Sequence, residues 1–281
     1  MKTLRIIPKL DIKGPNLVKG IHLEGLRVLG DPSEFARHYY EMGADELYFV
    51  DCVASLYGRN SIKEIISKTA SNVFIPITVG GGIRTLDDIK DALRAGADKV
   101  SINTAALNNP DFISLAAKKF GSSTIVVAIE AIKSDDGSYL AYTDNGREYT
   151  GKDVFDWALE VESLGAGEII ITSVDKEGTG DGFDIELTTK LSSLVSVPVI
   201  AHGGAGNYQD CIEVIENATL DGISIASMLH YTSYTKLLPY SNIVEGNTLF
   251  ASKGQGYHKF KEADLKSLKL YLQSKGVIVR I

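Results

Sequence analysis

The segment Arg5-Ile6-Ile7-Pro8-Lys9-Leu10-Asp11 decides the fold, together with a second segment of the same kind, Ile125-Val126-Val127-Ala128-Ile129-Glu130. Each is a short apolar run, rich in β-branched residues, that ends in a carboxylate. Such runs, without polar alternation, are typical of strands buried on both faces of a parallel sheet. The carboxyl ends of these strands carry the chemistry of parallel α/β proteins. We therefore expect Asp11 and Glu130 to face each other across one barrel mouth and share an acid–base task. A solvated strand end or a helix N-cap is the alternative for each.

Buried runs alternate with amphipathic helical segments along the whole chain, which predicts a parallel sheet. Eight runs, each but the last followed by a helical pattern, favour a closed (β/α)8 barrel, the TIM-barrel class of α/β folds, over an open sheet. The chain of 281 residues accommodates this barrel as one domain, residues 1–281. The expected strands are 5–10, 46–50, 74–79, 99–102, 124–129, 168–172, 198–201 and 222–225.

An internal repeat indicates that the barrel is a duplicated half-barrel. A glycine followed by alanine precedes three expected strands, at Gly43, Gly96 and Gly165, where a helix end needs a glycine to turn back. Two longer matches relate the halves. They pair 75–82 with 197–204, and Ser101-Ile102-Asn103-Thr104 with Ser224-Ile225-Ala226-Ser227.

Two segments interrupt the regular alternation. After Glu130, turn residues at 134–138 and 143–147 predict a short β-hairpin. Residues 237–258, rich in Gly, Asn, Ser and Tyr, form an insertion before a final helix expected at 261–274. An insertion of this length is expected to be either a functional flap or a mobile excursion.

Glycines and small polar residues recur at matching places in the two halves. The first candidate anion site comprises Gly81, Gly82, Asn103 and Thr104, and the second comprises Gly178, Gly203, Gly204, Ala226 and Ser227. Glycines let backbone N–H groups approach a phosphate, and a helix N-terminus adds a positive dipole end. The pair of sites predicts a ligand with a phosphate at each end. The alternative is that these glycines only make tight turns.

Further polar residues are expected at the same mouth. Lys19 belongs to the loop expected after the first strand, from which it is a candidate to close over a bound anion. Asp51, Thr172 and Asp175 end or follow strands and are candidates for substrate binding. An ordinary structural or solvated role is the alternative for each.

Composition argues against several classes of function. The formal net charge is −7 and no basic cluster contains interleaved aromatic residues, which argues against a nucleic-acid partner. The sequence has no signal peptide and no run of about 18 apolar residues, so we expect no membrane span and a cytoplasmic location. Cys52 and Cys211 make no disulfide framework. Five histidines without a ligand-spaced pair argue against a metal site, and no other cofactor is expected.

The motifs resemble those of one family, the cyclase subunit of imidazole glycerol phosphate synthase. The resemblance extends from Arg5 to about His230 and includes the final helix. It rests on segments 5–11, 17–20, 43–47, 78–84, 96–105, 165–169 and 203–206.

The resemblance implies a lyase of histidine biosynthesis that forms a heterodimer with a separate glutaminase subunit. Ammonia from that subunit would join a bisphosphorylated ribulosyl substrate, giving imidazole glycerol phosphate and aminoimidazole carboxamide ribotide. By resemblance, Asp11 is a general acid or base, Glu130 is the second catalytic acid and Lys19 holds the substrate. Asp98 would face the glutaminase. The ammonia gate at the opposite barrel end would be Arg5, Glu46, Lys99 and Glu168.

Several residues depart from the family's pattern. Glu130 replaces an aspartate, Lys9 a cysteine, His202 a small residue and Glu177 an aspartate, and the 237–258 insertion is additional. The departures keep a second hypothesis open, a paralogue that passes ammonia to a sugar amidotransferase in the synthesis of acetamidino sugars of surface polysaccharides. A third, a phosphosugar isomerase of the sister barrel family, is disfavoured because an isomerase needs no ammonia gate.

Overall fold

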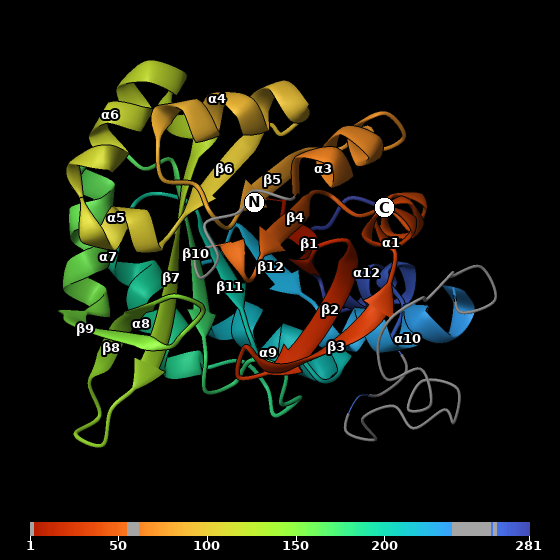
Figure 1. The fold of residues 1–281 in the computed structure, drawn as a ribbon. Helices are drawn as coiled ribbons and strands as arrows, with labels where there is room; N and C mark the ends of the chain where they lie inside the picture. Colours follow the sequence, from red (N-terminus) through yellow and green to blue (C-terminus); the bar gives the residue numbers. More distant parts are fainter. Residues whose placement is uncertain (1–2, 55–61, 238–259, 261–262) are drawn as a thin grey trace.

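The computed structural model describes residues 3–54, 62–237, 260 and 263–281. Parallel strands form the centre of the molecule and helices surround them (Figure 1). The barrel strands are β1 (Arg5–Lys13), β4 (Leu47–Asp51), β5 (Ile77–Gly80), β6 (Lys99–Ile102), β7 (Ile125–Lys133), β10 (Glu168–Ser173), β11 (Val199–His202) and β12 (Gly222–Ile225). Each expected strand is present, with ends that differ by up to four residues.

The pairing of the strands closes the barrel. β1 pairs with both β12 and β4, and β7 pairs with both β6 and β10, so no edge is left open. Every pairing around the ring is parallel. The expected (β/α)8 barrel is therefore confirmed.

The two halves begin in the same way, with a long strand that runs on into an antiparallel hairpin. β7 continues into β8 (Tyr139–Thr143) and β9 (Glu148–Asp153), the hairpin that the sequence predicts. β1 pairs antiparallel with β2 (Asn16–Ile21), which pairs with β3 (Glu24–Gly30). The loop expected around Lys19 is therefore wrong: Leu17 and Val18 are buried, and the segment gains the hydrogen bonds of a strand.

Helices cover the outside of the barrel (Figure 1). They are α1 (Pro32–Glu41), α3 (Ile62–Ala70), α4 (Leu86–Ala95), α5 (Thr104–Asn108), α6 (Asp111–Phe120), α7 (Val154–Ser163), α8 (Ile185–Leu194), α9 (Tyr208–Asn217), α10 (Ser227–Leu237) and α12 (Leu265–Ser274), with a 3-10 turn at Ser122–Thr124. The final helix begins at Leu265 rather than at 261, because Asp264 accepts a hydrogen bond from the Ser267 N–H and caps it. Apart from Leu237, which ends α10, the expected insertion lies outside the described residues. Within the described ranges, no helix is long and apolar enough to span a membrane.

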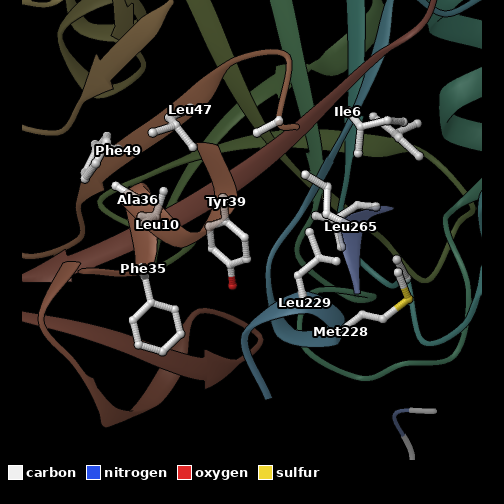
Figure 2. Close-up of a cluster of buried hydrophobic side chains, with 14 of the residues drawn as sticks. Ile6, Leu10, Phe35, Ala36, Tyr39, Leu47, Phe49, Met228, Leu229 and Leu265 are labelled. Atoms are coloured by element: carbon white, nitrogen blue, oxygen red, sulfur yellow. The ribbon is translucent and has the colours of Figure 1, made fainter. Parts of the chain in front are cut away.

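The main core lies between the barrel wall and the helices. Figure 2 shows Ile6 and Leu10 of β1 in one buried cluster with Tyr39 of α1 and Leu229 of α10. Successive side chains of a strand point to opposite faces, so the odd-numbered residues of β1 up to Asp11 point inward. Ile7 meets Tyr48, Val126, Ile170 and Ile200 in a small apolar layer inside the barrel. Polar side chains lie below and above this layer.

Candidate active site

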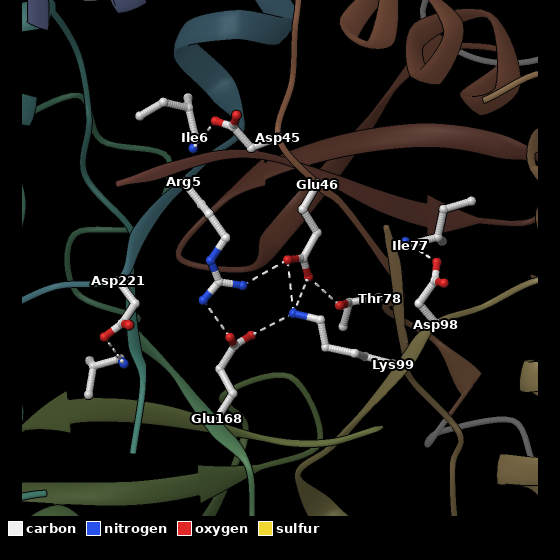
Figure 3. Close-up of polar contacts among 11 residues, drawn as sticks. Arg5, Ile6, Asp45, Glu46, Ile77, Thr78, Asp98, Lys99, Glu168 and Asp221 are labelled. Carbon is white, nitrogen blue, oxygen red and sulfur yellow. Dashed lines mark hydrogen bonds and ion pairs between the residues drawn. The ribbon is translucent and has the colours of Figure 1, made fainter. Parts of the chain in front are cut away.

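Four charged side chains form a ring at the amino-terminal end of the barrel (Figure 3). Arg5 donates to Glu46 at 2.9 Å and to Glu168 at 2.5 Å. Lys99 reaches the same two carboxylates, at 2.8 Å and 3.2 Å. Thr78 adds a hydrogen bond to Glu46 at 2.5 Å. The structure thus brings together the four residues expected to form a gate, and each carboxylate of the ring is bridged by both cations.

Asp98 lies beside this ring and is exposed. Its carboxylate accepts a hydrogen bond from the Ile77 N–H at 2.8 Å, as Asp45 does from the Ile6 N–H at 2.8 Å. The aspartate of the repeated Gly-Ala-Asp segment therefore anchors the start of a neighbouring strand. This contact gives Asp98 a structural role in addition to the expected position at a partner interface.

At the carboxyl end of β1, Asp11 lies inside a cluster of buried charges. Lys9 pairs with its Oδ1 at 2.9 Å, and Lys19 with its Oδ2 at 2.7 Å. Lys19 also pairs with Glu177, whose other oxygen lies 3.5 Å from His202 Nε2. Lys19 is only 1% exposed, so it forms part of this cluster instead of a movable loop.

The cluster keeps Asp11 ionised. Burial alone would raise the pKa of this carboxyl, but the ammonium groups of Lys19 and Lys9 outweigh burial and lower the pKa to about 2. Glu177 behaves in the same way: burial opposes its charge, but Lys19 and His202 hold its pKa well below the ordinary value. Both carboxylates are therefore fixed anions at neutral pH.

Glu130 lies in β7 at the same end of the barrel as Asp11. The environment of Asp11 lowers the pKa of that residue, whereas the environment of Glu130 raises its pKa. Burial raises the pKa of this carboxyl to about 7, although the Gly146 N–H, from the β8–β9 hairpin, donates to its Oε2 at 2.7 Å. Lys9 and Asp11 both contribute to this pKa, so the two acids interact across the mouth. A carboxyl with a pKa near neutrality can accept and return a proton at that pH.

The first glycine site is an open pocket of about 310 Å³ next to Glu130. Among the residues that line it are Asp51, Gly81, Gly82, Asn103, Thr104 and Glu130. Gly81 is required here: its φ is +86°, and a Cβ would lie 2.3 Å from the Asp51 carbonyl oxygen. Most of the first half's candidates therefore meet in one cavity with a catalytic candidate.

The second glycine site is far smaller. Gly178, Gly203, Gly204, Ala226 and Ser227 line one pocket, as expected, but they share it with Glu177 and His202, and its volume is about 10 Å³. Ser227 is the first residue of α10.

Thr172 and Asp175 take other positions around the mouth, whereas Asp51 lines the first pocket. Thr172 is buried in β10, in register with Glu130 on one side and His202 on the other. Asp51 accepts a hydrogen bond from the Val53 N–H at 3.1 Å. Asp175 is exposed at the rim and accepts from the Lys133 N–H at 2.8 Å.

The remaining reactive side chains point to no separate chemistry. Cys52 and Cys211 are buried free thiols. His230 lies in the outer core, where the Tyr39 hydroxyl donates to its Nδ1 at 2.6 Å and its Nε2 donates to the Lys9 carbonyl at 2.8 Å. Burial lowers the pKa of His230 to about 4. Among the described residues, no group of three or more His, Cys, Asp or Glu side chains could hold a metal.

Lys9 and Glu177 were not among the residues expected to form the site. Lys9 carries a signal in the sequence, because residues two apart in a strand share a face and Asp11 is two residues further on. The contact between Glu177 and Lys19 joins residues 158 positions apart, and no local pattern reveals it.

The closed barrel, with a carboxylate–lysine cluster and a titrating glutamate at the carboxyl ends of its strands, defines an enzyme of the (β/α)8-barrel class. The family model for "Histidine biosynthesis protein" matches residues 5–235. The chain is also 60% identical to the imidazole glycerol phosphate synthase subunit HisF of Legionella pneumophila over 210 residues, which are 75% of this chain and 99% of that relative. The chain therefore belongs to this family of histidine biosynthesis proteins.

Proposed function

We propose that the chain is the cyclase subunit of imidazole glycerol phosphate synthase. It joins ammonia to a bisphosphorylated ribulosyl substrate and releases imidazole glycerol phosphate and aminoimidazole carboxamide ribotide. The observation that carries the proposal is the pair of acids at the carboxyl ends of β1 and β7, with two glycine-lined pockets at the same end of the barrel. The pKa of Asp11 is lowered to about 2, that of Glu130 is raised to about 7, and Glu130 lines the first pocket. The family and the 60% identical relative support it.

Glu130 is the proton-transfer group in this proposal. When ammonia adds to the substrate carbonyl carbon, the new C–N bond leaves a surplus proton on nitrogen. Ionised Glu130 accepts this proton and returns it to the departing group in a later step. The Gly146 N–H holds the carboxylate in place.

Asp11 acts as a fixed charge beside the reacting atoms. Its two oxygens pair with Lys9 and Lys19. Asp11 thereby orients the ammonium of Lys19 toward the mouth and stays paired with it. A preorganised charge of this kind stabilises charge that develops in the transition state. Asp51, Thr172 and Asp175 contact the sugar parts of the substrate.

The two glycine sites hold the substrate's phosphates. In the first site, Gly82, Asn103 and Thr104 face the cavity beside Glu130, and glycine backbone N–H groups suit an anion there. In the second site, Gly203, Gly204 and Gly178 supply the backbone groups and Ser227 opens an 11-residue helix.

Ammonia enters through the ring of Arg5, Glu46, Lys99 and Glu168 and passes the apolar layer above it. A glutaminase subunit binds this end of the barrel as the partner in a heterodimer, with Asp98 at the interface. The described ring is closed by its four ion pairs, so passage requires at least one pair to open. We place the complex in the cytoplasm, where histidine biosynthesis takes place.

Neither the family nor the relative favours the alternative of a conduit to a sugar amidotransferase. A growth test separates the two functions. The gene is expressed in a bacterial strain that lacks its histidine-pathway cyclase, on medium rich in ammonium salts and without histidine. We expect growth, and no growth with Asp11→Asn; failure of the unaltered gene to support growth, with the protein present and folded, would contradict the proposed function.

A further inference from the structure

The second glycine site contains an unusual concentration of unsatisfied polar groups. Six buried side-chain N or O atoms in the described part of the chain have no hydrogen-bond partner there, and three of them line this one pocket. They are His202 Nε2, Ser224 Oγ and Ser227 Oγ, and the three side chains are 3%, 1% and 6% exposed. Buried polar groups are nearly always hydrogen-bonded in native proteins, so three that converge on one pocket point to a polar ligand.

The backbone fixes how the His202 ring lies. Its Nδ1 is 2.8 Å from the Ser224 carbonyl oxygen, which can only accept, so Nδ1 carries a hydrogen. Nε2 is therefore the ring atom turned to the pocket and to Glu177 Oε2, 3.5 Å away. A hydrogen on Nε2 can be donated to Glu177 or to a polar atom that enters the pocket.

The internal repeat shows what is particular about this residue. In the match of 75–82 with 197–204, His202 takes the place of Gly80 in the first half. A Cβ at Gly80 would already lie 3.2 Å from Ser101 Cβ, so a side chain there would crowd the open first site. In the second half the imidazole occupies that place, and the pocket is reduced to about 10 Å³, room for about one water molecule.

We infer that His202 is a side-chain ligand of the phosphate in the second glycine site, donating from Nε2 to a phosphate oxygen, with the Ser227 hydroxyl as a second donor. This inference rests on the proposed function, which places a substrate phosphate there. The first half binds its phosphate through backbone groups, Asn103 and Thr104, whereas the second half adds the imidazole of His202. Because a phosphate is larger than the present pocket, the ring moves as the anion enters, and Nε2 exchanges Glu177 for the phosphate.

The direct test uses inorganic phosphate as the probe and the full chain. Long-range 1H–15N spectra of the five histidine rings are recorded during a phosphate titration, and His202 is assigned from the loss of its signals in His202→Gln. We expect phosphate to shift the Nε2 signal of His202 in the unaltered protein. Phosphate binding, followed by 31P line broadening, that leaves the His202 signals unmoved would overturn the inference.

Steady-state kinetics give a second readout. Loss of a charge-assisted hydrogen bond in His202→Ala should raise KM for the bisphosphorylated substrate about tenfold or more, with kcat within about threefold if Glu130 is undisturbed. Ser227→Ala should raise KM less, since a neutral donor is lost. His38→Ala, on the outer helix α1, is the matched control and should leave both constants unchanged. An unchanged or lower KM in His202→Ala would mean that the ring only fills space.

Failure of this inference can be distinguished from failure of the proposed function. If the unaltered protein turns over the substrate but His202→Ala has the same KM, this inference fails and the proposed function stands. If the unaltered protein shows no turnover, the proposed function fails, and the phosphate titration still decides whether His202 contacts an anion. Should His202→Ala not fold, as judged by thermal melting, His202→Gln is used with the same expected direction.

Discussion

The ammonium of Lys9 lies 2.9 Å from Asp11 Oδ1, on the carboxylate oxygen that Lys19 leaves free. Both side chains are almost fully buried, and both point into the barrel from the same strand. Lys9 also acts on the pKa of Glu130. This one cation therefore influences both acids of the mouth.

Replacement of Lys9 should change the pH dependence of the reaction. In Lys9→Met the Asp11 carboxylate keeps only Lys19, so its pKa rises. The pKa of Glu130 also rises, because the positive charge that lowers it is gone, and the acidic limb of the kcat/KM profile therefore moves to higher pH. Lys9→Arg keeps the charge and should restore most of the profile. If Lys9→Met and the unaltered protein have the same pH profile of kcat/KM, Lys9 has no electrostatic role in the reaction.

Glu130 should govern the rate near neutral pH. With a pKa of about 7, the ionised base forms as the pH rises through this value, so kcat/KM corrected for the fraction of free ammonia should rise and then level off. Glu130→Gln should lower kcat by about 100-fold or more, since it can neither accept nor return the proton. The measurement is a pH series with ammonium salts; a corrected profile that is flat between pH values of about 6 and 8 would exclude Glu130 as the base.

The same carboxyl should make stability depend on pH. Its pKa is raised on folding, so the folded state is favoured while Glu130 stays protonated, and this contribution is lost as the pH rises through about 7. Glu130→Gln should therefore stabilise the protein above neutral pH, by roughly 2–3 kcal/mol at most, and little at acidic pH. Urea unfolding at one acidic and one alkaline pH measures the change in stability at each. Glu216→Gln, at an exposed site, is the control. Equal effects at the two pH values would contradict the raised pKa.

The ring at the amino-terminal end should contribute to stability through its buried carboxylates, Glu46 and Glu168. Glu46 is 3% exposed and meets Arg5, Lys99 and Thr78. In Glu46→Gln both cations share Glu168 alone, and the uncompensated charge should cost about 3 kcal/mol of unfolding free energy. Lys63→Gln removes an exposed ion pair to Asp91 and should cost less than about 1 kcal/mol. If Glu46→Gln and Lys63→Gln lower the free energy of unfolding equally, as measured in denaturant, the charges of the ring are not desolvated.

Gly204 should tolerate no side chain. Its φ is +108°, and a Cβ would lie 1.9 Å from the Gly182 carbonyl oxygen. Gly204→Ala should therefore displace the second glycine site, raise KM about tenfold and destabilise the protein by more than about 2 kcal/mol. Gly137→Ala has a similar φ of +86° and nothing within 4 Å, so it should show the cost of backbone strain alone, about 1 kcal/mol. If the two variants behave alike in melting and kinetics, the close contact at Gly204 has no consequence.

The sequence was sufficient to predict the barrel, because a strand buried on both faces has an unambiguous apolar pattern and repeated glycines mark where each strand follows a helix. The bounds of the first apolar run also placed Arg5 at one end of β1 and Asp11 at the other. The β2–β3 hairpin was not predicted, since its short strands mix apolar residues with glycine and charged residues and look like a loop until β2 pairs with β1.

Site contacts between distant residues were beyond prediction from sequence. Lys19 was expected above the mouth but is buried between Asp11 and Glu177, and only the folded hairpin brings it there. The two glycine sites look alike in sequence, yet one is open and the other nearly filled, because His202 stands where Gly80 stands in the first half. The size of a pocket depends on how side chains pack, which a repeat of motifs does not specify.

The central claim is that Asp11 and Glu130 carry out an ammonia-dependent cyclisation at this mouth. The most direct measurement is turnover of the bisphosphorylated ribulosyl substrate by the purified chain with ammonium salts at elevated pH, following release of aminoimidazole carboxamide ribotide. We expect turnover by the unaltered protein and by Glu216→Gln, and none above background with Asp11→Asn. No turnover by the folded, unaltered protein, or undiminished turnover by Asp11→Asn, would contradict the claim.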